Sequence, residues 1–209
     1  MWERNKRLPQ YAFPHGPVGR VVGAVTPLFH GGFYPRAARV LDLRAGDDVL
    51  DVACGSGRFL KKYAAQAHSI AGIDLSPVMV KAATRANRQR VAAGTAEFVV
   101  GDASTLPWHD GRFGAASIMG SFCVFPRPQA VLTELYRVLR PGGRMLVLVE
   151  WNADDGLDHS KDVEQRGMRI WSEDEVRSMV EDAGFSGIRI THANGPSMPK
   201  LLIVCGTRE

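Results

Sequence analysis

From Asp48 onward, short apolar segments alternate with amphipathic ones, and this alternation constrains the fold more than any other feature of the sequence. Strands are predicted at residues 49–53, 69–74, 97–100, 115–119 and 144–150, with helices through Leu60 and Tyr63 and at 77–93, 129–139 and 172–183. Such alternation predicts an α/β protein with a mostly parallel sheet and helices on both of its faces. The last two predicted strands, 188–192 and 201–206, are joined by only a turn, so we expect them to pair antiparallel.

Sequence signals at the ends of several segments support these bounds. Ser76–Pro77 provides an N-cap followed by proline at the first helical position, and Ser172 with Glu175 forms a capping box. A short helix is also predicted over Pro35–Leu43, with Gly46 just beyond its end.

The first 43 residues differ from the rest in composition. Residues 1–35 contain five of the 12 prolines. Apolar side chains between Val18 and Phe29 fall at helical spacing, but glycines and a proline interrupt them. We therefore divide the 209 residues into an N-terminal helical segment, 1–43, and one α/β domain, 44–209. This domain is long enough to bury a hydrophobic core without disulfide bonds or a structural metal.

The composition argues against several classes of protein. The net charge of +4 comes from Lys and Arg residues scattered along the chain, which gives no basic tract for nucleic acid. No apolar run approaches the roughly 20 residues that span a bilayer, and residues 1–10 do not resemble a signal peptide. Cys54, Cys123 and Cys205 lie far apart with no metal-ligand or disulfide-framework spacing, so we expect a soluble cytoplasmic protein without a metal site.

Acidic residues follow three consecutive predicted strands. Asp51, Asp74 and Asp102 end the first, second and third strands, and Met119 ends the fourth. Ligands of open parallel sheets bind beyond the carboxyl ends of the strands, so we expect the three carboxylates to surround one crevice. Gly55 and Gly57 follow the first strand and allow a tight turn whose backbone can approach a ligand closely.

Two ligand classes are compatible with this glycine turn. The dinucleotide fingerprint requires a third glycine where this chain has Leu60, and it places a pyrophosphate near the carboxylate of Asp51. A ligand with an ammonium and a sulfonium group is instead attracted by Asp51. Asp74 can then accept hydrogen bonds from ribose hydroxyls, and Asp102 can accept one from an adenine amino group. Taken singly, such glycines often form only turns and such acids only cap helices, but one ligand accounts for all of them.

These residues lie within longer motifs: VLDVACGSG at 49–57, GIDLS at 72–76, GDA at 101–103, LP at 106–107 and LRPGGR at 139–144. Over residues 40–207 the combination resembles the class I, Rossmann-like methyltransferases that use S-adenosylmethionine, especially the branch that methylates ubiquinone, menaquinone and phospholipids. The resemblance implies a three-layer αβα fold with a seven-stranded sheet in the order 3-2-1-4-5-7-6, its seventh strand antiparallel. It also implies S-adenosylmethionine as cofactor, S-adenosylhomocysteine as product, and a lid over the acceptor formed by the N-terminal segment.

The resemblance assigns the cofactor site to ten positions: Asp51, Ala53, Cys54, Gly55, Gly57, Asp74, Leu75, Asp102, Ala103 and Met119. It identifies no catalytic residue. His15, His30 and Tyr34 are candidates because they lie in the segment expected to cover the acceptor, and Glu150–Trp151 is a further candidate for acceptor contact at the tip of the fifth strand.

Two positions depart from the family pattern. Gly114 stands where the family commonly has an aspartate that supports the fourth strand. Residues 121–126 are unusually apolar at the place where the acceptor pocket is expected.

The sequence therefore predicts an enzyme that transfers a methyl group to a small or lipid-like apolar acceptor. Residues 18–29 allow either contact with a membrane surface or packing over the cofactor. RNA or protein acceptors are an alternative, although residues 119–122 lack the Asn/Asp-Pro-Pro-aromatic motif of adenine-N6 and glutamine methylating relatives. A non-catalytic regulator that binds S-adenosylmethionine is a further alternative.

Overall fold

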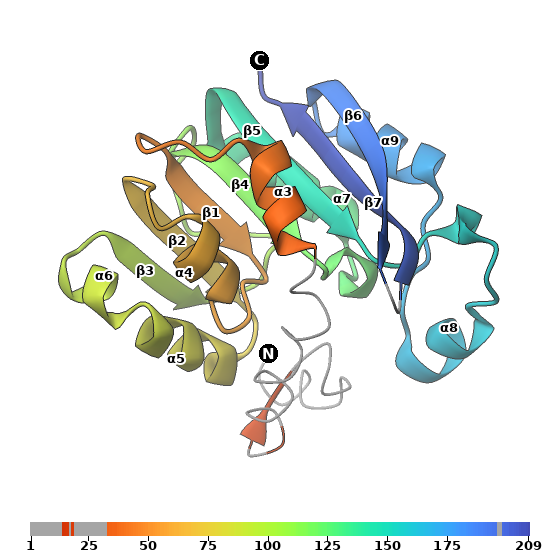
Figure 1. The fold of residues 1–209 in the computed structure, drawn as a ribbon, viewed down its shortest axis with the longest axis horizontal. Helices are drawn as coiled ribbons and strands as arrows, with labels where there is room; N and C mark the ends of the chain where they lie inside the picture. The colour runs from red at the N-terminus through yellow and green to blue at the C-terminus, as the bar shows by residue number, and fades with distance from the viewer. Residues whose placement is uncertain (1–13, 17, 19–32, 196–197) are drawn as a thin grey trace.

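The computed structural model describes residues 14–16, 18, 33–195 and 198–209, and a sheet of seven strands forms its centre (Figure 1). The strands are β1 (Asp48–Val52), β2 (Ser69–Asp74), β3 (Ala96–Val100), β4 (Phe113–Met119), β5 (Leu139–Val149), β6 (Ser186–Gly195) and β7 (Met198–Thr207). The α-helices are α3 (Tyr34–Leu41), α4 (Arg58–Tyr63), α5 (Pro77–Ala86), α6 (Arg88–Ala92), α7 (Pro128–Val138), α8 (Ser160–Arg166) and α9 (Glu173–Asp182). Two 3₁₀ turns, η1 (Phe122–Val124) and η2 (Ala153–Asp155), follow β4 and β5.

The strand order confirms the order implied by the sequence motifs. The strands lie in the order β3-β2-β1-β4-β5-β7-β6. Strands β1 to β5 pair in parallel with their neighbours, whereas β7 pairs antiparallel with both β5 and β6. The carboxyl ends of the parallel strands therefore share one edge of the sheet, which is where a ligand site is expected.

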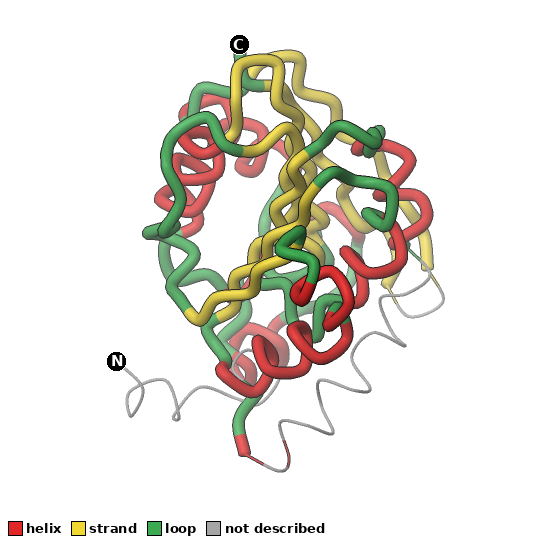
Figure 2. Tube along the Cα trace, turned by 90° about the vertical axis from the view of Figure 1, so that its left-hand side faces the viewer, coloured by secondary structure: helices red, strands yellow, loops and turns green. Residues whose placement is uncertain are grey.

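Helices cover both faces of the sheet, so the protein has three layers (Figure 2). On one face, α3 and α4 bury Leu41 and Leu60 in a core that includes β1 and β5 residues. On the other face, α7 and α9 bury Leu135 and Val180 in a larger core. Strand β4 lies in the middle and all of its residues are buried, which explains its continuous run of small and apolar side chains.

The helix predicted over 77–93 is two helices, α5 and α6. The side chain of Asn87 lies at the break and donates hydrogen bonds to the carbonyl oxygens of Gly57 (3.3 Å) and Ala83 (3.0 Å). Asparagine competes with the helical backbone for hydrogen bonds in this way, so the apolar periodicity alone overestimated the length of the helix.

Other elements also differ from the prediction. Strands β4, β6 and β7 are longer than predicted, at 113–119, 186–195 and 198–207. Helix α3 ends at Leu41 instead of Leu43 because Asp42 adopts the left-handed conformation, with φ 51°. Strand β5 begins at Leu139, directly after α7, because Leu139 already pairs with Phe113 before the register shifts. Helix α8 was not predicted, because its residues are mostly exposed and carry no apolar stripe. The capping box of Ser172 and Glu175 is confirmed, with both of its hydrogen bonds present.

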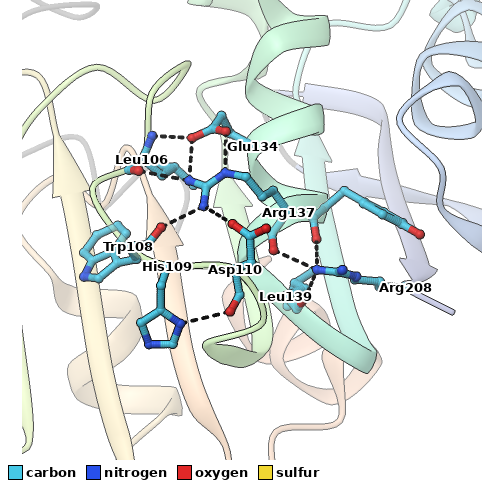
Figure 3. A network of polar contacts seen from close by, with 9 residues as sticks. Leu106, Trp108, His109, Asp110, Glu134, Arg137, Leu139 and Arg208 are labelled. Carbon is cyan, nitrogen blue, oxygen red and sulfur yellow. Dashed lines mark hydrogen bonds and ion pairs between the residues drawn. The ribbon is translucent and has the colours of Figure 1, made fainter.

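The carbonyl end of α7 is closed by Arg208, which follows β7. Its Nη1 atom donates to the carbonyl oxygens of Tyr136 (3.0 Å), Arg137 (2.7 Å) and Leu139 (2.5 Å) (Figure 3). The last carbonyls of a helix have no intrahelical donors, and a cation beside them also complements the helix dipole. Arg208 thus joins the end of β7 to the connection between α7 and β5.

Gly114, where the family commonly has aspartate, lies beside a buried ion-pair cluster. Asp47 is 2% exposed and accepts a hydrogen bond from Arg144 Nη2 at 2.5 Å, while Arg140 Nη2 lies 3.6 Å from its other oxygen. A Cβ atom at position 114 would lie 2.5 Å from Arg140 Nη2 and 2.8 Å from Asp47 Oδ1. Glycine therefore leaves the space that the Arg140 guanidinium occupies.

Helix α3 packs against the sheet, although it belongs to the N-terminal segment predicted from the sequence. Arg144 on β5 donates hydrogen bonds to the carbonyl oxygens of Leu41 and Asp42, both at 3.1 Å. His30 and nearly all of residues 18–29 lie outside the described residues. The division between 1–43 and 44–209 stays a prediction. Within the described part of the chain, no helix has the length and apolarity that a membrane crossing requires.

Candidate active site

Asp51 is a buried carboxylate on β1, beside the carboxyl-end edge of the sheet. It is 1% exposed, and Ser117 on the neighbouring strand β4 donates a hydrogen bond to its Oδ1 at 2.7 Å. Burial raises the pKa of Asp51 to about 7; the bond from Ser117 lowers it and the charge of Asp74 raises it further. An ionised Asp51 is therefore destabilised in the fold and is well suited to pair with a cation.

Asp74 holds the glycine turn and the start of α5 together. Its Oδ2 accepts a hydrogen bond from Gly55 N and its Oδ1 accepts one from Ser76 N, both at 2.8 Å. Burial raises the pKa of Asp74 to about 6, although these two backbone bonds lower it. Each carboxylate oxygen retains a second lone pair, so Asp74 can still accept hydrogen bonds from ribose hydroxyls.

The raised pKa values of Asp51 and Asp74 also affect stability. A carboxyl group whose pKa is raised by folding stabilises the native state at low pH, and that stability is lost as the pH rises through the folded-state pKa. For these two groups, the loss falls between about pH 4 and pH 7. Near pH 8 the protein therefore retains two costly negative charges at one edge of its sheet.

The turn after β1 requires an unusual backbone. Ala53, Gly55 and Gly57 all have positive φ values, at 56°, 51° and 68°. Positive φ is costly for alanine, and such strain is often retained where a site needs a particular backbone shape. A Cβ atom on Gly57 would lie 2.9 Å from Ala83 Cβ, whereas a Cβ atom on Gly55 would meet no described atom within 4 Å. Gly57 is thus required by packing against α5, and Gly55 leaves its surroundings open.

Cys54 lies in the same turn but is not suited to be a nucleophile. Its side chain is buried, and its backbone N–H donates to Ile73 O at 3.0 Å. Burial raises the pKa of the Cys54 thiol well above its ordinary value, and the charges of Asp74 and Asp51 add to the effect. The thiol therefore remains protonated near neutral pH, which fits the prediction that only its backbone matters.

Asp102 follows β3 and differs in character from the other two acids. Its Oδ1 accepts hydrogen bonds from Ser104 N (2.9 Å) and Ser104 Oγ (2.7 Å), and Arg127 Nη2 lies 3.4 Å from its Oδ2. Partial burial raises the pKa of Asp102, but the bonds from Ser104 and the charge of Arg127 outweigh it, so the pKa lies below its ordinary value. Asp102 is thus an ionised hydrogen-bond acceptor throughout the neutral range.

The structure brings the predicted cofactor residues to one edge of the sheet. Gly55 N contacts Asp74, and Gly101, next to Asp102, donates its N–H to the carbonyl oxygen of Asp74 at 3.1 Å. Ala53, Leu75 and Ala103 are partly exposed at this edge, and Met119 is buried at the tip of β4. Their predicted roles in cofactor binding remain predictions.

Tyr34 is the catalytic candidate that the structure describes most fully. Its ring packs edge-on against Phe59 and Tyr63, with centroids 5.5 and 6.3 Å away. Burial raises the pKa of the Tyr34 hydroxyl, and the negative charges of Asp51 and Glu150 raise it further. Tyr34 therefore remains a neutral phenol that can donate a hydrogen bond, and it is a poor candidate for a general base.

The structure describes fewer contacts of His15 and Glu150, the other candidates for catalysis or acceptor contact. His15 is partly buried, and its neighbour Pro14 accepts a hydrogen bond from Ser76 Oγ, so this short stretch lies near the start of α5. Glu150 is buried after β5, and a Cβ atom on Gly120 would lie 2.5 Å from its Oε1. The Glu150 carboxylate therefore lies directly against the tip of β4.

Much of the apolar loop at 121–126 is buried in the core of the protein. Phe122 and Cys123 are 1% and 2% exposed, and the ring of Phe122 lies 6.0 Å from that of Trp171. Phe122 and Phe125 belong to the large core between the sheet and helices α7 and α9. Their apolarity is accounted for by core packing.

Sequence reasoning missed three polar residues that support the site: Ser104, Ser117 and Arg127. Ser117 had a detectable signal, because it is a polar residue in an otherwise apolar predicted strand. Arg127 had none, since nothing in its neighbourhood of the sequence predicts contact with Asp102.

The site has the features that S-adenosylmethionine requires. A buried carboxylate with a raised pKa, Asp51, is complementary to a cationic ligand, and Gly55 leaves open space beside the turn. Residues 50–147 match a family model described as a methyltransferase domain. The seven-stranded fold and this match identify residues 50–147 as a methyltransferase domain on a Rossmann-like sheet.

Comparisons with individual proteins agree. The chain is 30% identical over 176 residues to 24-methylenesterol C-methyltransferase 2 of Oryza sativa subsp. japonica, which covers 78% of this chain and 48% of that protein. It is 39% identical over 109 residues to the ubiquinone/menaquinone biosynthesis C-methyltransferase UbiE of Ruegeria sp. (strain TM1040), covering 50% of this chain and 43% of that protein. These comparisons identify residues 50–147 as a methyltransferase domain that is similar to the class I, S-adenosylmethionine-dependent methyltransferases.

Two further facts define the extent of this similarity. The chain spans about half the length of these curated relatives. Among solved structures, the [4+2]-cyclase SpnF superposes with a TM-score of 0.73 at 22% identity, covering 96% of this chain and 97% of that one. The fold is therefore shared with a protein described by a different reaction.

Proposed function

We propose that this protein transfers the methyl group of S-adenosylmethionine to a small or lipid-like apolar acceptor. The observation that carries the proposal is the row of Asp51, Asp74 and Asp102 at adjacent strand ends, with the glycine turn beside them. When bound, S-adenosylmethionine supplies an electrophilic methyl group. The residues of the chain then need only bind, orient and shield the reactants, which can account for much of the acceleration.

Each acid has a distinct task in this proposal. Asp51 faces the cationic methionine part, directly or through a water, because its buried charge has no counterion of its own among the described contacts. Asp74 accepts hydrogen bonds from the ribose hydroxyls. Asp102 accepts one from the adenine amino group, and Leu75 and Ala103 pack against the ring.

The apolar acceptor is proposed from the relatives. The two curated relatives are named as C-methyltransferases of a methylenesterol and of ubiquinone/menaquinone biosynthesis. Such acceptors are apolar and lipid-like. The neutral phenol of Tyr34 and the buried carboxylate of Glu150 are the groups we place nearest to the acceptor, because the charges of Asp51 and Glu150 both act on the Tyr34 hydroxyl.

Two alternatives follow from specific observations. The likeness to a cyclase means that the fold alone does not require methyl transfer, so a cofactor-binding protein with another activity is the second candidate. RNA or protein acceptors are the third, although residues 119–122 lack the motif of those enzymes. Location in the cytoplasm and contact of residues 18–29 with a membrane surface also remain proposals, and sedimentation with anionic liposomes tests the latter.

Labelled methyl transfer into a cell extract separates these candidates. The purified protein is incubated with methyl-labelled S-adenosylmethionine and extract, which is then divided into lipid, small polar, RNA and protein fractions. We expect label in the lipid fraction, and none with the Asp74→Ala variant. Label in the RNA or protein fraction would show that the acceptor is RNA or protein instead of a lipid. Binding of the cofactor without transfer of label to any fraction would contradict the methyltransferase function.

The pKa of Asp51 predicts how cofactor affinity depends on pH. Since the pKa is about 7 in the free protein, only about a tenth of Asp51 is ionised at pH 6. A cationic ligand selects the ionised form, so the dissociation constant of S-adenosylmethionine should fall about tenfold between pH 6 and pH 8. Titration calorimetry at several pH values measures this, and Asp51→Asn should leave only the change of about twofold that ionisation of Asp74, with its pKa of about 6, contributes. A larger pH dependence that persists in Asp51→Asn would show that another group is responsible.

A further inference from the structure

Asp102 lies in a loop that is tied to α7 by two separate sets of contacts. One set lies along the helix, where Glu134 accepts a hydrogen bond from Leu106 N at 2.6 Å and Arg137 donates to Leu106 O at 3.0 Å (Figure 3). This set fixes the backbone of the loop. It does not include Asp102, so the loop has structural support that is independent of Asp102.

The second set begins at Arg127, the residue before α7, and ends on Asp102. Arg127 Nη2 donates to Ser104 Oγ at 2.6 Å, and Ser104 Oγ in turn donates to Asp102 Oδ1 at 2.7 Å. Ser104 is buried, at 8% exposed, whereas the side chain of Arg127 is 63% exposed. The buried serine hydroxyl thus links the arginine to the carboxylate.

These contacts leave the two oxygens of Asp102 unequal. Oδ1 accepts two hydrogen bonds from Ser104, from its N–H and from its hydroxyl. For Oδ2, the described contact is the longer one with Arg127, at 3.4 Å. Oδ2 therefore has the greater remaining capacity to accept a hydrogen bond from a ligand.

We propose that Arg127 is a positioning residue for base selectivity, which acts through Ser104 to hold Asp102 with Oδ2 available to a 6-aminopurine. The inference rests on the proposed function, because it takes the adenosyl cofactor as the ligand. A 6-amino group donates a hydrogen bond to Oδ2. A 6-oxo group has only acceptor lone pairs at that position, so it leaves the carboxylate unpaired and repels it, which is how a polar site rejects an analogue.

We expect Arg127 to affect cofactor affinity mainly by orienting Ser104 and Asp102, and only slightly through its positive charge. An exposed ion pair with one long contact contributes little energy by itself, so loss of the charge alone should change affinity only slightly. Without Arg127, the hydroxyl of Ser104 loses the donor that fixes its orientation, so its hydrogen bond to Asp102 Oδ1 holds the carboxylate less firmly, although Ser104 N still donates to the same oxygen. We expect Arg127→Ala to weaken binding of S-adenosylhomocysteine about fivefold and to leave binding of its 6-oxo analogue, S-inosylhomocysteine, unchanged.

Titration calorimetry with both ligands tests the proposal on the wild type, Arg127→Ala, Arg127→Lys, Asp102→Asn and the double variant Arg127→Ala/Asp102→Asn. Arg127→Lys should recover part of the preference for the adenosyl ligand, because its ammonium can still donate to Ser104. In the Asp102→Asn background, removal of Arg127 should have no further effect, since it acts through Asp102. In turnover assays, Arg127→Ala should raise KM for S-adenosylmethionine with kcat within about twofold.

Several results would overturn the proposal. Equal weakening of the binding of both ligands by Arg127→Ala would indicate a structural role. So would a loss of affinity on removal of Arg127 that is as large in the Asp102→Asn background as in the wild type. Arg177→Ala is the matched control, since Arg177 also forms an exposed ion pair, with Glu173 on α9, and it should change neither affinity. If the wild type binds no S-adenosylhomocysteine, the proposed function fails together with this inference. If the wild type binds it and Arg127→Ala binds equally well, only this inference fails.

Discussion

Replacing Asp74 with alanine should weaken binding of S-adenosylmethionine by about 100-fold. Two hydrogen bonds from ribose hydroxyls to a carboxylate contribute about 1.5–3 kcal/mol each, and about 3 kcal/mol in total already corresponds to a hundredfold change. The same substitution removes the acceptors for Gly55 N and Ser76 N, so the glycine turn also loses its preferred position. Titration calorimetry near pH 8, where Asp74 is ionised, measures the effect.

Stability must be measured alongside, because Asp74 also contacts the backbone. Burial raises the pKa of Asp74 to about 6, which means that its ionised form is disfavoured in the ligand-free fold. Loss of the buried charge should offset the loss of the hydrogen bonds from Gly55 N and Ser76 N, so the melting temperature near pH 8 should change by no more than a few degrees. Asp158→Ala is the control, because Asp158 likewise accepts a hydrogen bond from the N–H two residues on, but its side chain is exposed and its described contacts do not include the glycine turn. A folded Asp74→Ala protein with wild-type affinity would contradict the assigned cofactor site.

Replacing Gly57 with alanine should destabilise the fold by about 3 kcal/mol. Its φ of 68° costs a non-glycine residue about 1 kcal/mol or more. The added methyl group would also lie 2.9 Å from Ala83 Cβ and 3.2 Å from Ala83 Cα, and overpacking of this kind costs about 1–3 kcal/mol. The contact is with the helix backbone of α5, so a change of side-chain rotamer cannot relieve it. Urea unfolding followed by circular dichroism measures the loss.

Gly55 provides the matched comparison two residues earlier in the same turn. It has a similar positive φ, 51°, but a Cβ atom there would meet no described atom within 4 Å. Gly55→Ala should therefore lower the free energy of unfolding only by the conformational strain, about 1 kcal/mol. It should also weaken binding of the cofactor, because the added methyl group crowds the space beside the turn. Equal loss of stability in the two variants would show that packing against α5 is not the reason for Gly57.

The order of the sheet could be predicted because its signals are local or carried by motifs. Strand–helix alternation, the capping box at Ser172 and the turn before β7 each act over a few residues. The break between helices α5 and α6 at Asn87 could not be predicted, because it depends on a hydrogen bond to Gly57, thirty positions away in the sequence. Apolar spacing continues through the break and gives no sign of it.

The candidate site divides in the same way. Asp51, Asp74 and Asp102 could be found because each one follows a recognisable strand. Their individual electrostatic character could not, since it depends on partners from other strands and loops, such as Ser117 for Asp51 and Arg127 for Asp102. The burial of Phe122 could not be predicted for a related reason: apolar composition does not distinguish a pocket wall from a core residue.

The place of β7 in the sheet has a consequence for the synthesis of this chain on the ribosome. β7 is made after β6, yet it lies between β5 and β6 and pairs with both. Until β7 emerges, β6 has no neighbour in the sheet and the apolar edge of β5 remains open, whereas strands β1 to β4 can already assemble. The half of the domain that carries the three acids is thus translated first. The other half is assembled last, and its nascent form is the one that most needs protection from aggregation.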